Sequence, residues 1–271
     1  MLELLPLTYS ELATSSDFAE RNIWELIYGG SYPGPYNENI ATALWYKSYV
    51  TRYLQRDVRQ LIKVKDLSKF HLFLKLYAGR HEQLINLTEI GTACGISHAT
   101  VSEWLNLLAL SYILFRLPPY HKNFNKRLVK NSKLYFYDSR LVCHLLGIES
   151  AQHAEIHASR GALFEGYVIS EVIKLFFARA KTPNIYFWNS HKGFEIDLLI
   201  EQAGKVHAIE IKSSATYSND FTKQLKKWLA LDALKNNDDC FVVYAGYETL
   251  TVNGTNIIPY KEIHKNIVKG L

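Results

Sequence analysis

The most regular alternation of apolar and polar positions lies between Phe194 and Ile211. Even-numbered positions from Phe194 to Ile200 are apolar, and a Gln-Ala-Gly-Lys turn sequence follows at 202–205. Beyond the turn the apolar positions are odd-numbered, ending at Ile209 and Ile211. An apolar residue at every second position is typical of a half-buried strand, so this stretch predicts a β-hairpin with one apolar face.

The register of this hairpin follows if the apolar sides of both strands are buried together. A short loop at 203–204 then pairs Leu198 with Ile209. The same register sets Asp197 directly opposite Glu210 on the other face. Like charges opposite each other destabilise a sheet by roughly 0.2–1 kcal/mol, so we expect a positive charge between them.

A divalent cation held by hard carboxylate oxygens, Mg²⁺ or Mn²⁺, meets that requirement. Lys212 follows Glu210 by two residues and lies on the same strand face. A metal ion lowers the pKa of a bound water, and an adjacent ammonium group orients that water and stabilises charge on a phosphoryl oxygen. These are the needs of phosphodiester hydrolysis. The alternative, an exposed strand face with an ordinary Glu–Lys ion pair, stays open.

Further apolar runs predict the rest of a sheet. Residues 186–188 form an early strand, and residues 240–244 form a wholly apolar strand after a helix at 220–231, as buried parallel strands do. An amphipathic helix is predicted over 162–171, ahead of these strands. This order of elements predicts an α+β or α/β architecture with a mixed central sheet in this domain.

The first half of the chain is predicted to be helical. A helix begins near Leu87, Gly95 supplies the left-handed residue of a tight turn, and Ser97 is placed to cap a second helix that runs to Ala109. This helix-turn-helix pattern is more specific for a fold than for DNA binding. The second helix has no Lys or Arg with which to contact bases or phosphates. Its expected exposed residues are His98, Ser102, Glu103 and Asn106.

A basic stretch without acidic residues follows at 121–133, where the wing of a winged helix would lie. Its cations are predicted to contact nucleic-acid phosphates. A solvated loop, or a surface for a partner subunit, is an equally supported alternative. The predicted nucleic-acid-binding residues are Lys122, Lys126, Arg127, Lys130 and Lys133.

Composition changes this picture little. The 271 residues are 48% hydrophobic, enough for one or two sizeable cores, and the net charge of +5 weakly favours acidic partners such as nucleic acid. The three cysteines have no metal-ligand spacing, so we expect reduced thiols in a cytoplasmic protein. No run approaches the roughly 18–20 apolar residues that span a bilayer, and no membrane partner is expected.

The constellation of Asp197 with the strand sequence Glu210-Ile211-Lys212 resembles the core motif of the PD-(D/E)xK nuclease superfamily. The resemblance implies a restriction-endonuclease-like fold with Asp197, Glu210 and Lys212 as catalytic residues. It also implies a metal ion bound by the two carboxylates and the Ile211 carbonyl oxygen.

Members of the superfamily often supply one more acid from a preceding helix. Glu165 matches that place and is predicted as a further metal ligand, although a solvated glutamate in a first helical turn is the alternative. The chain departs from the motif at Ile196, which stands where the motif name has proline.

Almost the whole chain resembles the C-terminal region of uncharacterised prokaryotic AAA-type ATPases, in which a winged-helix segment and a nuclease-like domain follow an ATPase domain. The resemblance implies a connector at 1–36, a helical and winged-helix domain at 37–150 and a nuclease-like domain at 151–271. No G-x-x-x-x-G-K-[ST] sequence occurs, so we expect no ATP site here and an AAA-type ATPase domain or subunit as partner. The matching pieces are residues 2–12, 29–33, 49–58, 133–138, the helix around Glu165 and the 194–212 hairpin.

Three functions stay open. The first is a metal-dependent nuclease acting on DNA or RNA. The second is a nucleic-acid-binding or protein-docking module that keeps the fold without turnover, and the third is an assembly fragment for a partner ATPase. The joint presence of Asp197, Glu210 and Lys212 favours the first function, whereas the lack of Lys and Arg on the second helix of the helix-turn-helix and the modest net charge favour the others.

Overall fold

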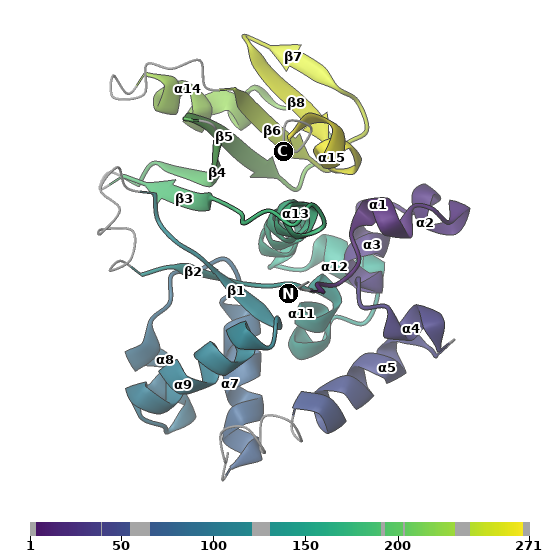
Figure 1. Ribbon diagram of the computed structural model, residues 1–271, viewed down its shortest axis with the longest axis vertical. Helices are drawn as coiled ribbons and strands as arrows, with labels where there is room; N and C mark the ends of the chain where they lie inside the picture. The colour runs from purple at the N-terminus through teal and green to yellow at the C-terminus, as the bar shows by residue number, and fades with distance from the viewer. Residues whose placement is uncertain are drawn as a thin grey trace.

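The computed structural model describes residues 4–38, 40–54, 66–120, 131–190, 193–202, 204–230 and 239–267. A helical N-terminal region is followed by a six-stranded mixed sheet with helices against it (Figure 1), which confirms the predicted α+β architecture. Within these ranges, no helix combines the length and the apolar character needed to cross a membrane.

Short helices open the chain, and side chains that accept backbone N–H groups fix where they begin. Thr8 and Asn22 cap the first and third helices, each in a capping box with a glutamate three residues later. A π-helical turn over Tyr49–Leu54 continues the fifth helix. The bounds are α1 (Tyr9–Leu12), α2 (Ser16–Glu20), α3 (Ile23–Gly29), α4 (Gly34–Asn37) and α5 (Thr42–Ser48).

The helix-turn-helix prediction is confirmed. α8 (Leu87–Cys94) ends at Gly95, whose φ of 61° and ψ of 43° are left-handed. Ser97 then accepts the Thr100 N–H through its side chain, and α9 (His98–Leu110) begins there.

A small sheet follows α9 and completes the winged-helix order of elements. β1 (Leu114–Leu117) pairs antiparallel with β2 (Lys133–Phe136). Residues 82–85, between α7 (Leu67–Gly79) and α8, form backbone hydrogen bonds to the other side of β2. β2 is therefore held along both of its edges.

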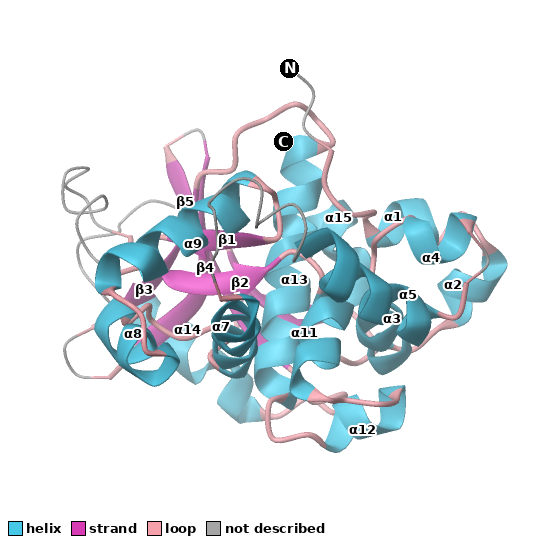
Figure 2. Ribbon diagram, turned by 90° about the horizontal axis from the view of Figure 1, so that it is seen from below, coloured by secondary structure: helices cyan, strands magenta, loops and turns pink. Residues whose placement is uncertain are grey.

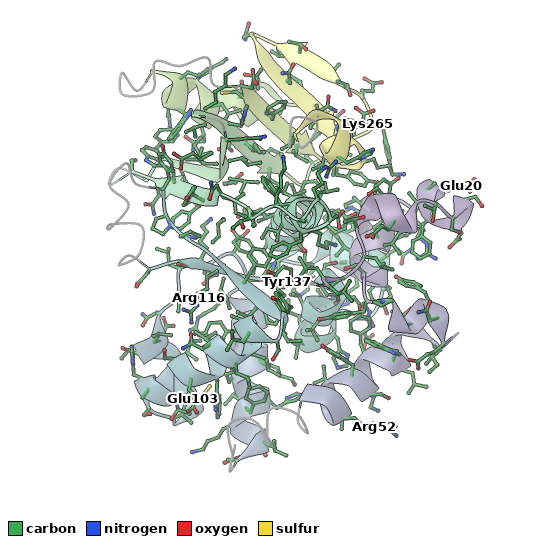
Figure 3. All side chains as sticks on the ribbon, viewed as in Figure 1. Glu20, Arg52, Glu103, Arg116, Tyr137 and Lys265 are labelled. Carbon is green, nitrogen blue, oxygen red and sulfur yellow. The ribbon has the colours of Figure 1, made fainter. Side chains whose placement is uncertain are left out.

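The outer face of α9 offers no basic side chain to a nucleic acid. Figure 3 shows Glu103 at the surface of this helix, which contains no lysine or arginine. Arg116 of β1 reaches α9, but its guanidinium donates to Asn106 Oδ1 at 2.8 Å. Phosphate contacts would therefore have to come from other parts of the chain.

One long helix, α13 (Arg160–Phe177), lies between the helical region and the large sheet in Figure 1, and Figure 2 shows it near the centre of the molecule. Most of its side chains are buried. α11 (Ser139–Leu146) and α12 (Ala151–Ile156) pack against it. Asp138 caps α11, as its position before the helix suggests, by accepting the Leu141 N–H at 2.8 Å.

The large sheet has the strand order β3-β4-β5-β6-β8-β7. β3, β4 and β5 are successively antiparallel, whereas β5, β6 and β8 run parallel, so the sheet is mixed as predicted. The strands are β3 (Ile185–Asn189), β4 (Glu195–Gln202), β5 (Lys205–Lys212), β6 (Cys240–Tyr244), β7 (Leu250–Val252) and β8 (Thr255–Pro259). The accompanying helical elements are a 3-10 turn (Asn219–Thr222), α14 (Lys223–Leu229), a second 3-10 turn (Tyr260–Glu262) and α15 (Ile263–Asn266).

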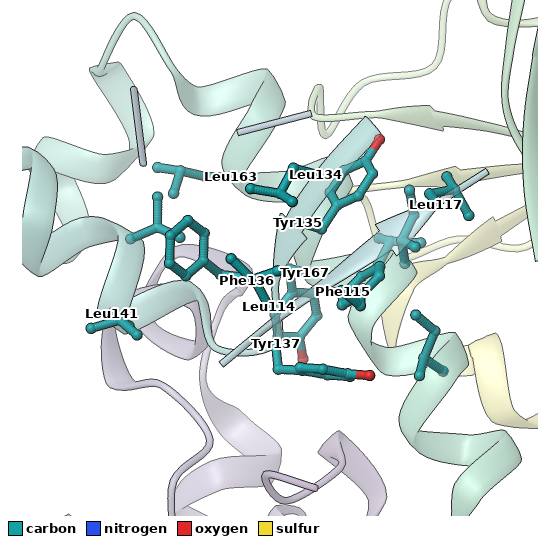
Figure 4. Close-up of a cluster of buried hydrophobic side chains, with 14 of the residues drawn as sticks. Leu114, Phe115, Leu117, Leu134, Tyr135, Phe136, Tyr137, Leu141, Leu163 and Tyr167 are labelled. Carbon is teal, nitrogen blue, oxygen red and sulfur yellow. The ribbon is translucent and has the colours of Figure 1, made fainter. Parts of the chain in front are cut away.

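Two hydrophobic clusters cover opposite faces of this sheet. The larger one contains Phe164 of α13 and Leu198 of β4, and it continues through the helical region. Figure 4 shows its part around β1 and β2, where the rings of Phe115 and Tyr135 stack with centroids 5.5 Å apart. The smaller cluster packs Trp228 of α14 against the other face. The helical region and the sheet therefore share one core.

α13 approaches the loop after α7 so closely that only glycine fits at position 166. A Cβ atom at Gly166 would lie 1.9 Å from His81 Nε2. His81 is 4% exposed, and its Nδ1 accepts the Phe136 N–H at 3.4 Å. Burial lowers the pKa of His81 to about 3, so the ring is neutral in the folded protein.

We expect Gly166→Ala to lower the free energy of unfolding by about 1–3 kcal/mol, because the added methyl group must displace a buried ring. Urea unfolding measures the change. Gly161→Ala on the same helix is the matched control, since no neighbouring atom lies within 4 Å of a Cβ at that position. Stability should be unchanged or higher in the control, because alanine favours helix; equal losses in both variants would contradict the close approach.

Candidate metal centre

β4 and β5 follow the predicted register up to the point where the two strands separate. Leu198 pairs with Ile209, as predicted, and the ladder continues from there to the turn. Beyond this pair the Asp197 carboxylate enters the gap, and its Oδ2 accepts the Ile211 backbone N–H at 2.7 Å. Asp197 and Glu210 are therefore brought together where the strands diverge and are not a paired rung of the ladder.

A β-bulge takes Asp197 out of the ladder. The register between β3 and β4 shifts by one residue, so that Asp197 and Leu198 lie opposite the single residue Phe187. As a result, Ile196 belongs to the cluster on the α14 face, whereas Leu198 belongs to the cluster on the α13 face. The prediction that both lie on one face of the hairpin is wrong, because strict alternation has no place for the extra residue.

Glu210 is almost completely buried, with 1% of its surface exposed. Lys212 Nζ donates to its Oε2 at 2.7 Å, while Oε1 has no hydrogen-bond partner among the described residues. The end of this strand is fixed by Arg160 of α13, which donates to the Ser213 carbonyl at 2.9 Å. The alternative that Glu210 lies on an exposed strand face is therefore wrong.

Glu165 points from α13 toward the same region. Its side chain is 12% exposed, and it accepts a hydrogen bond of 2.5 Å from the Tyr135 hydroxyl. It lies in the second turn of α13, so the alternative of a solvated first-turn glutamate is also wrong. The helix thus brings a third acid toward Asp197 and Glu210, and the charge of Glu165 acts on Asp197.

Lys133 lies inside this region. Its side chain is 9% exposed, and its ammonium group pairs with Glu195 and, at 3.5 Å, with Glu165 Oε1. It therefore offers no free ammonium group to a phosphate. The other predicted nucleic-acid contacts, at Lys122, Lys126, Arg127 and Lys130, lie outside the described residues and stay predictions.

Glu82 is a residue of the site that the sequence analysis missed. It has a positive backbone φ of 70° in the loop after α7, and its carboxyl group is near enough to that of Glu165 for Glu165 to act on its pKa. A non-glycine residue with positive φ is uncommon and is often found at functional sites. No motif marks Glu82, because its place depends on pairing between the 82–85 segment and a strand about 50 residues later.

Burial and mutual repulsion make these acids reluctant to ionise. The pKa of Asp197 is raised to about 7, first by burial and then by the charge of Glu165. Burial raises the pKa of Glu165 to about 8 against the opposing charge of Lys133. The pKa of Glu210 is raised to about 8 by burial and then by Asp197. Lys133 and Lys212 therefore do not fully offset the effect of burial on these acids.

The oxygen atoms at the strand divergence fit a hard divalent cation. Glu210 Oε1 is buried without a partner, and Asp197 uses its Oδ2 for a backbone N–H while no described residue bonds its Oδ1. Among the described residues, no three Asp, Glu, His or Cys side chains converge as a ready-made metal site. Mg²⁺ commonly binds through one or two carboxylates and keeps several waters, so two protein oxygens suit it.

The raised pKa values set the direction of a pH effect on stability. These acids ionise near pH 4 when unfolded but near pH 7–8 when folded, so the folded protein holds more protons between those values. In a buffer that contains a metal chelator, the contribution of these acids to the free energy of unfolding should fall as the pH rises from about 5 to about 8. We expect Glu210→Gln to reduce this slope and to stabilise the protein near pH 8.

Urea unfolding across that pH range, compared variant by variant, measures the effect. Glu20→Gln is a matched control, because Glu20 is exposed on α2, away from the strand divergence (Figure 3). A Glu210→Gln protein less stable than wild type near pH 8 would mean that the Lys212 ion pair outweighs the repulsion between the acids.

Comparison with known proteins gives two domain matches. Residues 20–152 match a domain of unknown function, DUF8612, and residues 160–263 match another, DUF4143. Uncharacterized proteins of Mycobacterium bovis (Mb2031c) and Mycobacterium tuberculosis (Rv2008c) are each 29% identical over 220 residues, which cover 80% of this chain and 48% of the relative. The chain thus spans about half the length of these curated relatives. No solved structure matches. Two stretches of the chain are thus similar to domains of unknown function, the first to DUF8612 and the second to DUF4143, and both stretches contribute residues to the acidic site.

Proposed function

We propose that this chain is a metal-dependent nuclease that hydrolyses phosphodiester bonds of DNA or RNA through Asp197, Glu210 and Lys212. The observation that carries the proposal is the buried, unpartnered Oε1 of Glu210 beside Asp197 and Lys212. Burying a carboxylate oxygen without a partner is costly, and proteins keep such groups chiefly where they serve a ligand or a reaction.

The carboxylates would hold the metal ion. When bound, Mg²⁺ or Mn²⁺ supplies a Lewis acid and lowers the pKa of a coordinated water. Glu210 Oε1 and Asp197 Oδ1 are the proposed ligands, with the Ile211 carbonyl oxygen and Glu165 as proposed further ones. The Ile211 N–H keeps the Asp197 carboxylate oriented through its other oxygen.

Lys212 is suited to act on water and phosphate. Glu210 Oε2 fixes its ammonium group, and 31% of the side chain is exposed, so it reaches both the buried acid and solvent. Burial lowers the pKa of Lys212, but Asp197 and Glu210 raise it more, and the net pKa is raised. A charged ammonium group there would orient the attacking water and stabilise negative charge on a phosphoryl oxygen.

Nucleic acid is proposed to bind through its backbone. The cations Lys122, Lys126, Arg127 and Lys130 of the 121–130 stretch are the proposed phosphate contacts, and the net charge of +5 supports an acidic partner. The lack of basic residues on α9 supports binding without base recognition.

An AAA-type ATPase domain or subunit is a proposed partner. The curated relatives are about twice as long as the stretch matched here, which leaves room in them for a further domain. If the site does not hydrolyse nucleic acid, the alternative function is a nucleic-acid-binding or protein-docking module that serves such a partner.

Cleavage of single- and double-stranded DNA and RNA with Mg²⁺ or Mn²⁺ tests the proposal. We expect metal-dependent cleavage that Asp197→Asn and Lys212→Met each reduce by at least about 100-fold, as removal of a group that stabilises transition-state charge does. Lys223→Met is the matched control and should cleave like wild type, because Lys223 is an exposed lysine of α14 that pairs with Asp220.

Preparations of all four proteins should be identical, because trace contaminating nucleases are the main confounder. Equal cleavage by all four proteins, or no cleavage by any, would contradict a nuclease at this site.

A further inference from the structure

Lys133 brings a positive charge to the acidic site from outside the predicted catalytic residues. It lies on β2 in the helical region, whereas those residues lie on the large sheet. Its buried ammonium group pairs with Glu165 of α13 and Glu195 of β4. It therefore stands between two carboxylates from different elements, and Glu195 is only two residues from Asp197.

The backbone around Lys133 holds this ammonium group in place. Lys133 pairs with Leu117 of β1 on one side and bridges to Leu84 on the other. The ring of Phe187 lies 5.5 Å from Nζ and adds a cation–π contact. A lysine anchored on both strand edges is a fixed charge rather than a mobile surface cation.

Backbone hydrogen bonds also join the small sheet to the large one. The Phe187 N–H donates to the Pro118 carbonyl at 3.0 Å, and the Tyr120 N–H donates to the Phe187 carbonyl at 2.7 Å. Phe187 is the residue that faces the bulge at Asp197. The distance between the strand of Lys133 and the strand of Asp197 is therefore set by main-chain bonds.

We propose that Lys133 is a built-in cation that takes the place of a second divalent metal ion, so that the site binds a single ion at the strand divergence. Two carboxylates that face one fixed cation are also suited to a hard divalent ion. Glu82 adds a third carboxyl group beside Glu165. Without the ammonium group, Glu82, Glu165 and Glu195 would lose the cation that offsets their ionisation.

This inference rests on the proposed function only for the metal ion that Asp197 and Glu210 are proposed to bind. Two simpler roles for Lys133 predict different results. A purely structural ion pair would lower stability when removed and would add no metal ion. A phosphate contact would weaken nucleic-acid binding and would leave the number of bound metal ions unchanged.

Titration of the full chain with Mn²⁺, followed by the electron paramagnetic resonance signal of the free ion, counts bound ions without requiring activity. We expect about one ion in the wild type and about one more in Lys133→Met, consistent with carboxylate ligation of hard cations. Lys133→Arg should bind the same number as wild type, because the guanidinium keeps the charge. Adding Glu195→Gln to Lys133→Met should remove the additional ion.

Lys174→Met is the matched control. Lys174 is also buried, at 3% exposure, and pairs with Glu171 of the same helix α13, but it donates to the Leu7 carbonyl, away from the strand divergence. Its loss should leave the number of bound ions unchanged. Circular dichroism shows whether each variant is folded, and Lys133→Gln replaces Lys133→Met if the methionine variant does not fold.

Three outcomes would overturn the role of Lys133: an unchanged ion count in the folded Lys133→Met or Lys133→Gln protein, a gain in Lys133→Arg, or two ions in the wild type. A wild type that binds no Mn²⁺, with one ion in Lys133→Met, would support the built-in cation. That same outcome would overturn the metal-dependent nuclease proposal, so the two failures are distinguishable.

Discussion

The burial of several acids with too few cations is the constraint on which the rest of this site depends. Asp197, Glu165 and Glu210 all have raised pKa values, since burial and mutual repulsion both oppose ionisation. Lys133 and Lys212 neutralise only part of the charge. The fold retains this cost where β4 and β5 separate, next to the larger of the two apolar clusters.

The main chain enforces this arrangement. Phe187 bonds through its backbone to residues 118–120 and faces the β4 bulge, so the bulge and the helical region are fixed together. α13 packs against the helical region and against the large sheet, and Gly166 allows it to lie against His81. The result is a composite site, with acids from the stretch that matches DUF4143 and Glu82, Tyr135 and Lys133 from the stretch that matches DUF8612.

Local patterns in the sequence predicted the elements well. Alternation located the hairpin and its Leu198–Ile209 register, and cap chemistry located the turn at Gly95 and Ser97. These predictions succeeded because they depend on residues close together in the chain. The β7–β8 hairpin was missed although Asn253 and Gly254, with φ of 50° and 78°, are a recognisable turn signal.

What the sequence could not predict depends on distant contacts. The bulge at Asp197 depends on β3 and on residues 118–120, so alternation along β4 placed Ile196 on the wrong face. Lys133 belongs to a basic stretch, and only the pairing of β2 with both of its neighbours shows that it points into the acidic site. A charge pattern along a chain does not reveal which partner the fold supplies.

The central claim is that a divalent cation completes the buried acids at the strand divergence. Crystals of the protein grown with Mn²⁺ and measured for anomalous scattering test it most directly. The account predicts a single strong anomalous peak about 2.1 Å from Glu210 Oε1 and within ligand distance of Asp197. No peak there, or a peak only between Glu82 and Glu165, would contradict it.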